Sequence, residues 1–293
     1  MKFRAHDTFF IRKGWLYKGM KNVRRDPAVF MGVNGNPMDV LGIGANMVKA
    51  LRYWLQAVEL TSEPSKGKRT QTLTPFGDVI FQHDKYIEEI GTLWLLHYKL
   101  AKNLEDATAW SFFFNEFNMN EFTRDDFISQ LTKYIRIHDV TVSDRSLDDD
   151  YTCIINTYVP RIKSNPEKVL PESNIDCPFG ELGLIDIVSK KDRVYKKCIP
   201  KKDTLHPLIL LAVIIDNAKD GEREIKISTI HNDINNAGKI FCLDIITLIN
   251  SLSKIESLGY IKVVRTAGLD VIEITTKMNF IDCVQEYYKL INA

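Results

Sequence analysis

The sequence predicts a mainly α-helical fold with small β-hairpins, in which N-terminal and C-terminal winged-helix-like modules flank a helical middle. Residues 41–77 place a Gly-containing turn, an amphipathic helix, a basic tongue and a Pro-Gly stop in the order typical of a winged helix. Residues 205–293 repeat this order and close on a two-stranded hairpin. The four expected parts are a basic module over 1–82, an acidic helical middle over 83–160, an irregular linker over 161–204 and the C-terminal module over 205–293.

Length and composition bound the class of protein. A chain of 293 residues is long enough for two domains of ordinary size, and its 45% hydrophobic residues can form real cores. No apolar run approaches the roughly 18 residues that cross a bilayer, and the first ten residues lack the apolar core of a signal peptide. We expect a cytoplasmic protein without membrane contact, whose five widely spaced cysteines are reduced thiols in small apolar sites.

Charge is divided unevenly along the chain, although the formal net charge is only +1. Residues 1–75 carry 13 Lys and Arg against 5 Asp and Glu, a net of +8. Residues 76–150 carry 7 against 15, a net of −8, and the remainder carries 19 against 18. Because clustered cations release counterions from a phosphate backbone, the N-terminal part is where a nucleic-acid partner is expected.

The first module contains a candidate DNA-reading helix. It is expected to begin near Asn46, whose side chain would cap it after the turn at Gly42 and Gly44. Its apolar stripe is Met47, Val48, Leu51, Leu55 and Val58. The opposite side carries the candidate DNA contacts Lys49, Arg52, Tyr53 and Gln56, a row that could lie in the major groove. An ordinary solvated surface would show the same pattern.

A basic tongue follows this helix and favours the DNA-binding interpretation. The segment PSKGKRTQT places Lys66, Lys68 and Arg69 at a hairpin tip before LTPFGDVIF resumes an apolar pattern. Wings of this type contact phosphates or a minor groove. Arg12 and Lys13 add two further candidate contacts near the start of the chain.

The acidic middle is expected to support the fold or to dock a protein. His97 falls on the apolar face of a helix over residues 84–101, where a hydrogen-bonded core histidine is favoured over a catalytic base. The aromatic run Trp110–Phe117 favours core packing over base stacking, because surrounding carboxylates would repel phosphates. Asp148–Asp150 favours capping of a helix start over a Mg²⁺ site, because adjacent residues on a helix point in different directions.

The C-terminal part shows the winged-helix order more fully. Prolines and charges over residues 161–204 indicate an extended linker. LHPLILLAVIID then predicts a buried helix, EIKIS a strand, STIHNDIN a helix capped by Ser228 or Thr229, and FCLDIITLINSLSKIESLGY a third helix. The hairpin IKVVRTAGLDVIEI turns at Ala267–Gly268. Because the third helix exposes few cations, dimerisation or docking suits this module as well as DNA binding does.

Six segments, taken in order, resemble one known family: FRAHDTFFIRKGWLYKG, LGIGANMVKALRYWLQA, LTPFGDVIF, HDKYIEEIGTLWLLHY, WSFFFNEF and ESNIDCPFGELGLI. Over about residues 3–200, and less distinctly beyond, the chain is similar to the bacterial domain-of-unknown-function family number 4007. The resemblance implies a protein encoded beside DNA phosphorothioation genes, with a cysteine desulfurase, an ATPase and a reductase-like pyrophosphatase as partners. SspB-like members of the family are associated with DNA nicking, which would open one strand for sulfur insertion.

Two small departures from the family pattern stand at His6-Asp7, where His-Glu is expected, and at Ala45-Asn46, where a basic residue often precedes the Asn. The sequence has no PD followed by ExK, no HNH-like spacing and no GxxxxGK[ST] loop. His6 beside Asp7 could supply a base, but a positioning contact is favoured. Catalytic residues are therefore unassigned, no cofactor is evident, and Mg²⁺ or Mn²⁺ would serve only if the protein is a nuclease.

The leading hypothesis is a DNA-binding component of a phosphorothioation-linked phage-defence system that engages double-stranded DNA, with nicking of that DNA left open. Two alternatives belong to other classes. One is a non-catalytic winged-helix transcription regulator, and the other is a scaffold that recruits the sulfur-transfer enzymes through the acidic middle.

Overall fold

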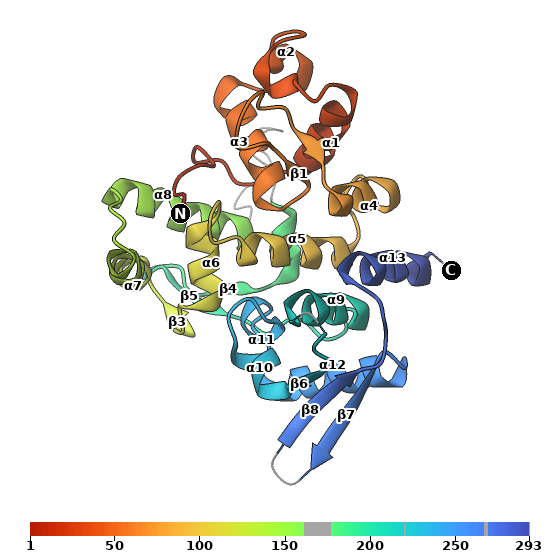
Figure 1. Cartoon of the computed structure of the whole chain (residues 1–293). Coiled ribbons are helices and arrows are strands. Elements are labelled where there is room, and N and C mark those ends of the chain that lie inside the picture. Colours follow the sequence, from red (N-terminus) through yellow and green to blue (C-terminus); the bar gives the residue numbers. More distant parts are fainter. Residues whose placement is uncertain (161–176, 220, 267–268, 293) are drawn as a thin grey trace, which may run out of the picture.

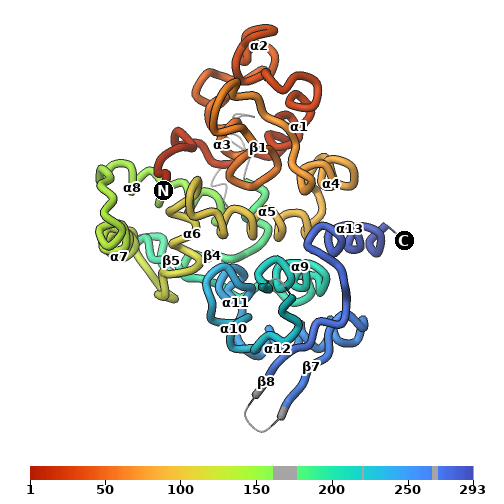
Figure 2. The backbone as a smooth tube through the Cα atoms, in the orientation of Figure 1, coloured from red at the N-terminus to blue at the C-terminus, as the bar shows by residue number. Residues whose placement is uncertain are grey.

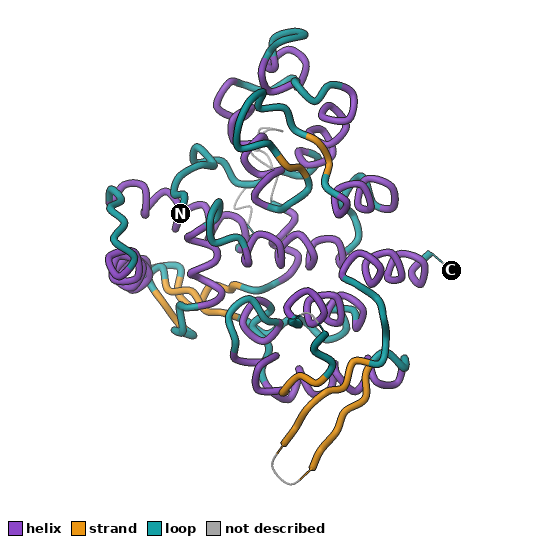
Figure 3. Tube along the Cα trace, in the orientation of Figure 1, coloured by secondary structure: helices purple, strands orange, loops and turns teal. Residues whose placement is uncertain are grey.

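Helices make up most of the fold, and short antiparallel strands join them (Figures 1 and 3). The computed structural model describes residues 1–160, 177–219, 221–266 and 269–292. The helices of the first half are α1 (Trp15–Arg25), η1 (Val29–Met31), α2 (Pro37–Leu41), α3 (Ala45–Ala57), α4 (Pro75–His83), α5 (Ile90–Lys102), α6 (Thr108–Asn115), α7 (Arg124–Ile137) and α8 (Asp144–Tyr158). Those of the second half are η4 (Pro178–Leu182), α9 (Pro207–Asn217), α10 (Ile227–Asn232), α11 (Ala237–Ile240), α12 (Ile245–Ser257) and α13 (Phe280–Ile291). The expected mainly helical fold with small hairpins is confirmed.

The strands of the described residues form three small sheets. Their order is β1-β2, β3-β5-β4 and β6-β8-β7, and every pair is antiparallel. The strands are β1 (Thr61–Ser62), β2 (Thr72–Leu73), β3 (Glu121–Phe122), β4 (Ile185–Ser189), β5 (Val194–Lys197), β6 (Glu224–Lys226), β7 (Ile261–Thr266) and β8 (Leu269–Ile274). The trace in Figure 2 places α2 and the β7-β8 hairpin at opposite ends of the molecule, with α5 between them.

The apolar stripe predicted for α3 is confirmed. Val48, Leu51, Leu55 and Val58 are buried, and Met47 packs against the same core. The predicted cap is wrong, because α3 starts at Ala45 and Gly44 precedes it without a side-chain cap. Asn46 is then the second residue inside the helix, a position from which its side chain cannot satisfy the first free N–H groups.

The expected Pro-Gly stop after the tongue is instead the start of helix α4. The Oγ1 of Thr74 accepts a hydrogen bond from the backbone N–H of Gly77 at 2.9 Å, and Pro75 occupies the first turn. A proline is well placed there because its missing N–H would have no partner within the helix. A Cβ on Gly77 would lie 2.0 Å from the carbonyl oxygen of Leu60, so this close approach requires a glycine.

Helix α5 is buried along its length from Gly91 to Ala101 and lies at the centre of the molecule (Figure 1). The prediction that it begins at residue 84 is wrong by six residues. The carboxylate of Asp84 accepts hydrogen bonds from the backbone N–H groups of Glu88 and Glu89, both at 3.0 Å. These bonds fold residues 84–89 into a loop that leads into the helix.

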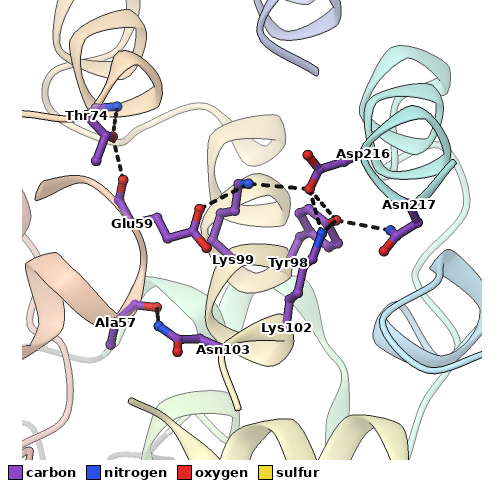
Figure 4. A network of polar contacts seen from close by, with 10 residues as sticks. Ala57, Glu59, Thr74, Tyr98, Lys99, Lys102, Asn103, Asp216 and Asn217 are labelled. Carbon is purple, nitrogen blue, oxygen red and sulfur yellow. Dashed lines mark hydrogen bonds and ion pairs between the residues drawn. The ribbon is translucent and has the colours of Figure 1, made fainter. Parts of the chain in front are cut away.

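Lys99 on α5 connects the N-terminal part of the chain to the C-terminal part. Its ammonium lies 3.1 Å from Glu59, which follows α3, and 3.5 Å from Asp216 on α9. The hydroxyl of Tyr98 donates to the same Asp216 carboxylate oxygen at 2.6 Å, and Figure 4 shows the three elements meeting there. Lys99 is only 7% exposed, so its pairing with both carboxylates offsets much of the cost of removing a charge from water.

The aromatic run of α6 packs into the core, as predicted. Trp110, Phe112, Phe113, Phe114 and Phe117 are at most 4% exposed. His97 meets them as a hydrogen-bonded core residue: the hydroxyl of Tyr158 donates to Nδ1 at 2.8 Å, and Nε2 donates to the carbonyl of Ile240 at 2.8 Å. Burial lowers the pKa of His97 to about 4, which keeps the ring neutral at physiological pH.

The prediction that Asp148–Asp150 caps a helix start is wrong. The cap of α8 is Ser143, and the three carboxylates follow within the helix. Each is bound by a different partner from another segment: Asp148 by Arg124 on α7, Asp149 by Arg4, and Asp150 by His6. Their divergent directions place them on different sides of α8, so they attach the N-terminal segment and α7 to this helix.

Residues 177–204 are more ordered than the predicted irregular linker. They contain η4 and the strands β4 and β5, and β5 also pairs with β3. Strand β5 places Tyr195 opposite Phe122, and those two rings stack at 6.1 Å. This cross-strand packing accounts for order that prolines and charges alone do not indicate. Residues 161–176 of the predicted linker lie outside the described residues.

The C-terminal part follows the predicted sequence of helix, strand, two helices and two strands, with the short helix α11 added. The caps proposed for its second helix, Ser228 and Thr229, are wrong, because α10 starts at Ile227 after Lys226. Asp244 caps α12 by accepting from the N–H of Thr247 at 2.6 Å. The predicted turn at Ala267–Gly268 lies outside the described residues. Within the described part of the chain, no helix is long and apolar enough to cross a membrane.

Candidate nucleic-acid interface

Five basic side chains gather on α3 and on the loop between β1 and β2. We call this set the α3-loop surface, and it consists of Lys49, Arg52, Lys66, Lys68 and Arg69. Helix α3 presents the first two opposite its buried stripe, and the loop over residues 63–71 carries the others. The fold thus brings together the basic helix and the basic tongue that the sequence predicts as DNA contacts.

Lys49 is exposed on α3 and, among the described residues, makes neither an ion pair nor a hydrogen bond. Arg52 differs, because its Nε and Nη2 both donate to one carboxylate oxygen of Glu63, at 3.0 and 2.8 Å. Arg69 lies 3.4 Å from the other oxygen of Glu63. One glutamate therefore holds two of the five cations, and Lys49 remains available to a phosphate.

Tyr53 and Gln56 do not fit the predicted row of DNA contacts. The hydroxyl of Tyr53 donates to the carbonyl of Asp106 at 3.0 Å, and its ring packs against Trp54 and His6. Burial raises the pKa of Tyr53 well above its ordinary value. The amide of Gln56 donates to the carbonyl of Arg52 at 3.1 Å. Tyr53 thus points into the protein, and Gln56 bonds its own helix.

The loop that carries Lys66 and Lys68 has a shorter hairpin base than a wing usually has. Strands β1 and β2 contain two residues each. The hydroxyl of Thr61 donates to Gln71 at 3.1 Å, and the N–H of Gln71 donates to the carbonyl of Pro27 at 2.9 Å. These bonds anchor the base of the loop, whereas both lysines are exposed at its tip.

The two candidate contacts near the start of the chain have different environments. The guanidinium of Arg12 lies over the rings of Phe9 and Trp15, at 5.7 and 5.3 Å from their centroids. Lys13 is exposed just before α1. Within the described parts of the chain, neither residue forms a hydrogen bond or an ion pair with the α3-loop surface, so they stand as separate candidates.

Sequence reasoning did not identify Glu63 as a partner of the basic residues. A single glutamate among basic residues is the only sign of such a partner in the sequence. Only the fold shows that the Glu63 side chain contacts Arg52 on α3. Arg24 and Arg25 were also not singled out, and both are exposed in the last turn of α1. This turn precedes Pro27, whose carbonyl binds the base of the basic loop.

His6 is not positioned to act as a base on a bound ligand. Its Nε2 lies 2.7 Å from the Asp150 carboxylate, and its Nδ1 accepts from the N–H of Thr8 at 3.1 Å. Both His6 and Asp150 are essentially excluded from solvent, at 0% and 1% exposure. Burial raises the pKa of Asp150, while the hydrogen bond from His6 opposes that rise. The pair therefore fixes the N-terminal segment onto α8.

Fold and surface together define a mainly helical protein with a basic α3-loop surface at one end and a helix-strand-helix-helix-hairpin part at the other. The chain belongs to the family described as protein of unknown function (DUF4007), which matches residues 3–288. Its structure is similar to a magnesium ion-bound SspB crystal structure at a TM-score of 0.85 and 26% identity, covering 100% of this chain and 89% of that one. A second SspB crystal structure matches at a TM-score of 0.84, with the same identity and coverage. No curated protein sequence matches the chain.

Proposed function

We propose that this protein is the DNA-binding component of a phosphorothioation-linked phage-defence system, and that the α3-loop surface contacts double-stranded DNA. The observation that carries the proposal is the grouping of Lys49, Lys66 and Lys68, which are exposed and unpaired among the described residues, beside two arginines. Unpaired surface cations contribute to DNA affinity by releasing condensed counterions from the phosphates. The similarity to SspB and membership of the family support the link to phosphorothioation.

The C-terminal part, residues 205–293, is proposed to be a winged-helix module. Its order of α9, β6, α10, α12 and the β7-β8 hairpin supports this assignment, as does the central place of β8 in the sheet. The N-terminal part, residues 1–82, has the helix and basic loop of such a module but only two-residue strands. We therefore propose that this part contacts DNA mainly through its positive charge, with the loop between β1 and β2 as a flexible arm.

Nicking of the bound DNA is a further possibility that the SspB-like members of the family suggest. A metal-dependent nuclease needs carboxylates that converge on one ion. Among the described residues no group of three or more His, Cys, Asp or Glu side chains is arranged to hold a metal, and Asp148–Asp150 bind other side chains. These residues do not fit a Mg²⁺ site, so we derive no catalytic step through a metal.

Incubation of the purified protein with supercoiled plasmid distinguishes a DNA-nicking component from a transcription regulator and from a scaffold. Binding that weakens steeply with salt, followed by relaxation in Mg²⁺ or Mn²⁺, is the result expected for a nicking component. Binding to one promoter sequence without cutting would favour a transcription regulator. Absence of DNA binding, together with capture of the cysteine desulfurase, would favour the scaffold and overturn the proposal. A matched preparation with Lys49, Lys66 and Lys68 changed to Gln controls for a contaminating nuclease.

A further inference from the structure

A cleft separates the β3-β5-β4 sheet from helices α10 and α11 of the C-terminal part. It has a volume of about 530 Å³, within the range of pockets that hold small molecules. Its apolar lining includes Phe114, Phe117, Cys242 and Leu243. Its charged and titratable lining consists of three lysines, a histidine and two carboxylates: Lys196, Lys197, Lys239, His231, Glu121 and Asp244.

Lys197 places its ammonium at the end of α6 inside this cleft. Its Nζ donates to the carbonyl oxygens of Phe113 and Phe117, at 2.6 and 2.5 Å, and lies over both rings. Burial is the main reason that the pKa of Lys197 is lowered to about 8; Cys242 opposes this shift, and Lys239 adds to it. Two of its three N–H groups are thereby used on carbonyl oxygens, and the ammonium forms no ion pair with a carboxylate among the described residues.

Lys239 is the second cation of the cleft and also lacks a counterion. Its Nζ donates to the neutral amide oxygen of Asn118 at 2.8 Å in an exposed hydrogen bond, and it makes no ion pair with any described residue. The hydrogen bonds of Lys197 to carbonyl oxygens at the end of α6 account for the position of its ammonium, but not for that of Lys239. This second ammonium in the same cleft forms no ion pair with either lining carboxylate: Asp244 accepts from the N–H of Thr247, and Glu121 is in no ion pair among the described residues. An anion that bound between the two lysines would neutralise both charges.

We propose that this cleft binds a phosphate group, and that Lys197 and Lys239 supply the positive charge that holds it. A second groove, lined by Lys226, Ser228, Ile245 and Asp270, continues from the cleft through the shared residues His231 and Asn232. That groove passes the starts of α10 and α12, the helices of the proposed winged helix. A phosphate carried by a single DNA strand is thus favoured over a free nucleotide, and this choice rests on the proposed function.

Two cysteines that line the cleft can report whether a ligand binds there. Cys198 and Cys242 line it and are half-buried, whereas Cys153 and Cys283 are buried elsewhere, so alkylation of these two reports unfolding of the protein. The full-length protein is treated with iodoacetamide alone, or with inorganic phosphate, thymidine 5′-monophosphate or a 12-nucleotide single-stranded oligonucleotide. Peptide mass spectrometry then gives the alkylation rate of each cysteine. At a ligand concentration of about ten times Kd, the rate at Cys198 and Cys242 should fall roughly tenfold.

Substitutions decide whether the lysines are responsible. Lys239→Gln should abolish the protection while the protein keeps its thermal stability, and Lys133→Gln, an exposed lysine on α7, should leave the protection unchanged. Protection by the oligonucleotide and the monophosphate supports the proposal. Protection by the monophosphate alone keeps the phosphate site but overturns its assignment to a DNA strand. Equal protection in the Lys239→Gln variant, or none in the wild type, overturns the site itself.

A second measurement distinguishes an incorrect phosphate site from an incorrect DNA-binding function. Duplex binding is measured on the same proteins by fluorescence anisotropy at several salt concentrations. A wild-type protein that binds duplex DNA but shows no cysteine protection would overturn the cleft proposal alone. A protein that binds no duplex but is protected by the monophosphate would overturn the DNA-binding function and leave a phosphate site.

Discussion

Arg52 on α3 and Glu63 in the basic loop are joined by two hydrogen bonds, at 3.0 and 2.8 Å, to a single carboxylate oxygen. The Glu63 side chain is only 9% exposed, so the pair is partly shielded from water and salt. This relationship divides the α3-loop surface into cations that a phosphate can reach directly and arginines that it can reach only by displacing a carboxylate.

Glu63→Gln should increase the affinity for duplex DNA, because it removes the one carboxylate that neutralises Arg52 and Arg69. We expect several-fold tighter binding at low salt and a salt slope steeper by about one for each arginine that gains a phosphate contact. Titration by fluorescence anisotropy at four salt concentrations measures both quantities. Glu105→Gln, an exposed carboxylate of the acidic middle, is the charge-matched control. Weaker binding by Glu63→Gln would mean that the pair positions Arg52 instead of masking it.

Tyr53→Phe should leave DNA binding unchanged and reduce stability. The hydroxyl that it removes donates to the carbonyl of Asp106 within the protein, and a hydrogen bond of this kind contributes about 1 kcal/mol. Urea unfolding measures the loss, and anisotropy measures the affinity. A clear drop in affinity with unchanged unfolding would return Tyr53 to the DNA interface.

Asp150→Ala should be among the most destabilising single changes in the acidic middle. It leaves the buried Nε2–H of His6 and the N–H of Arg4 without their acceptor. Unpaired buried donors of this kind cost about 3 kcal/mol together. Asp148→Ala, which breaks the more exposed pair with Arg124, should cost less than about 1 kcal/mol. Similar unfolding midpoints for the two variants would contradict the structural role of the His6–Asp150 pair.

His97 should make the protein acid-sensitive between about pH 6.5 and 4. Its pKa is about 4 in the folded protein and near 6.5 when unfolded, so the unfolded state binds the proton first as pH falls. The contribution to stability is complete above pH 6.5 and is lost toward pH 4, by up to about 3 kcal/mol. His97→Gln keeps a donor and an acceptor but does not titrate. Unfolding free energies of the two proteins that run parallel over this pH range would refute the assignment.

The sequence was informative where a pattern is local. Helical spacing identified the buried stripe of α3 and the core position of His97, because a helix face is defined by residues three and four apart. Pairings between distant residues could not be read in this way. His6 and Asp150 are 144 positions apart. Strand β5 pairs with β4, its neighbour in the sequence, but also with β3, which lies far earlier in the chain.

The site shows the same division between local and distant information. Charge counting found the basic end of the chain, and spacing placed Lys49 on the exposed side of α3. Spacing also placed Tyr53 there, although its ring fits between Trp54 and His6 and its hydroxyl finds a backbone acceptor. Neither composition nor periodicity reveals that Glu63 holds Arg52, since this depends on how the loop returns to the helix.

The salt dependence of duplex binding tests the central claim most directly. The triple variant Lys49→Gln, Lys66→Gln, Lys68→Gln is compared with a control in which three exposed lysines elsewhere are changed in the same way: Lys133, Lys190 and Lys289. Loss of three phosphate contacts should make the negative slope of log K against log salt shallower by about 2.7. The control should retain the wild-type slope. Equal losses in both variants would show that net charge alone drives binding and would contradict a DNA contact at the α3-loop surface.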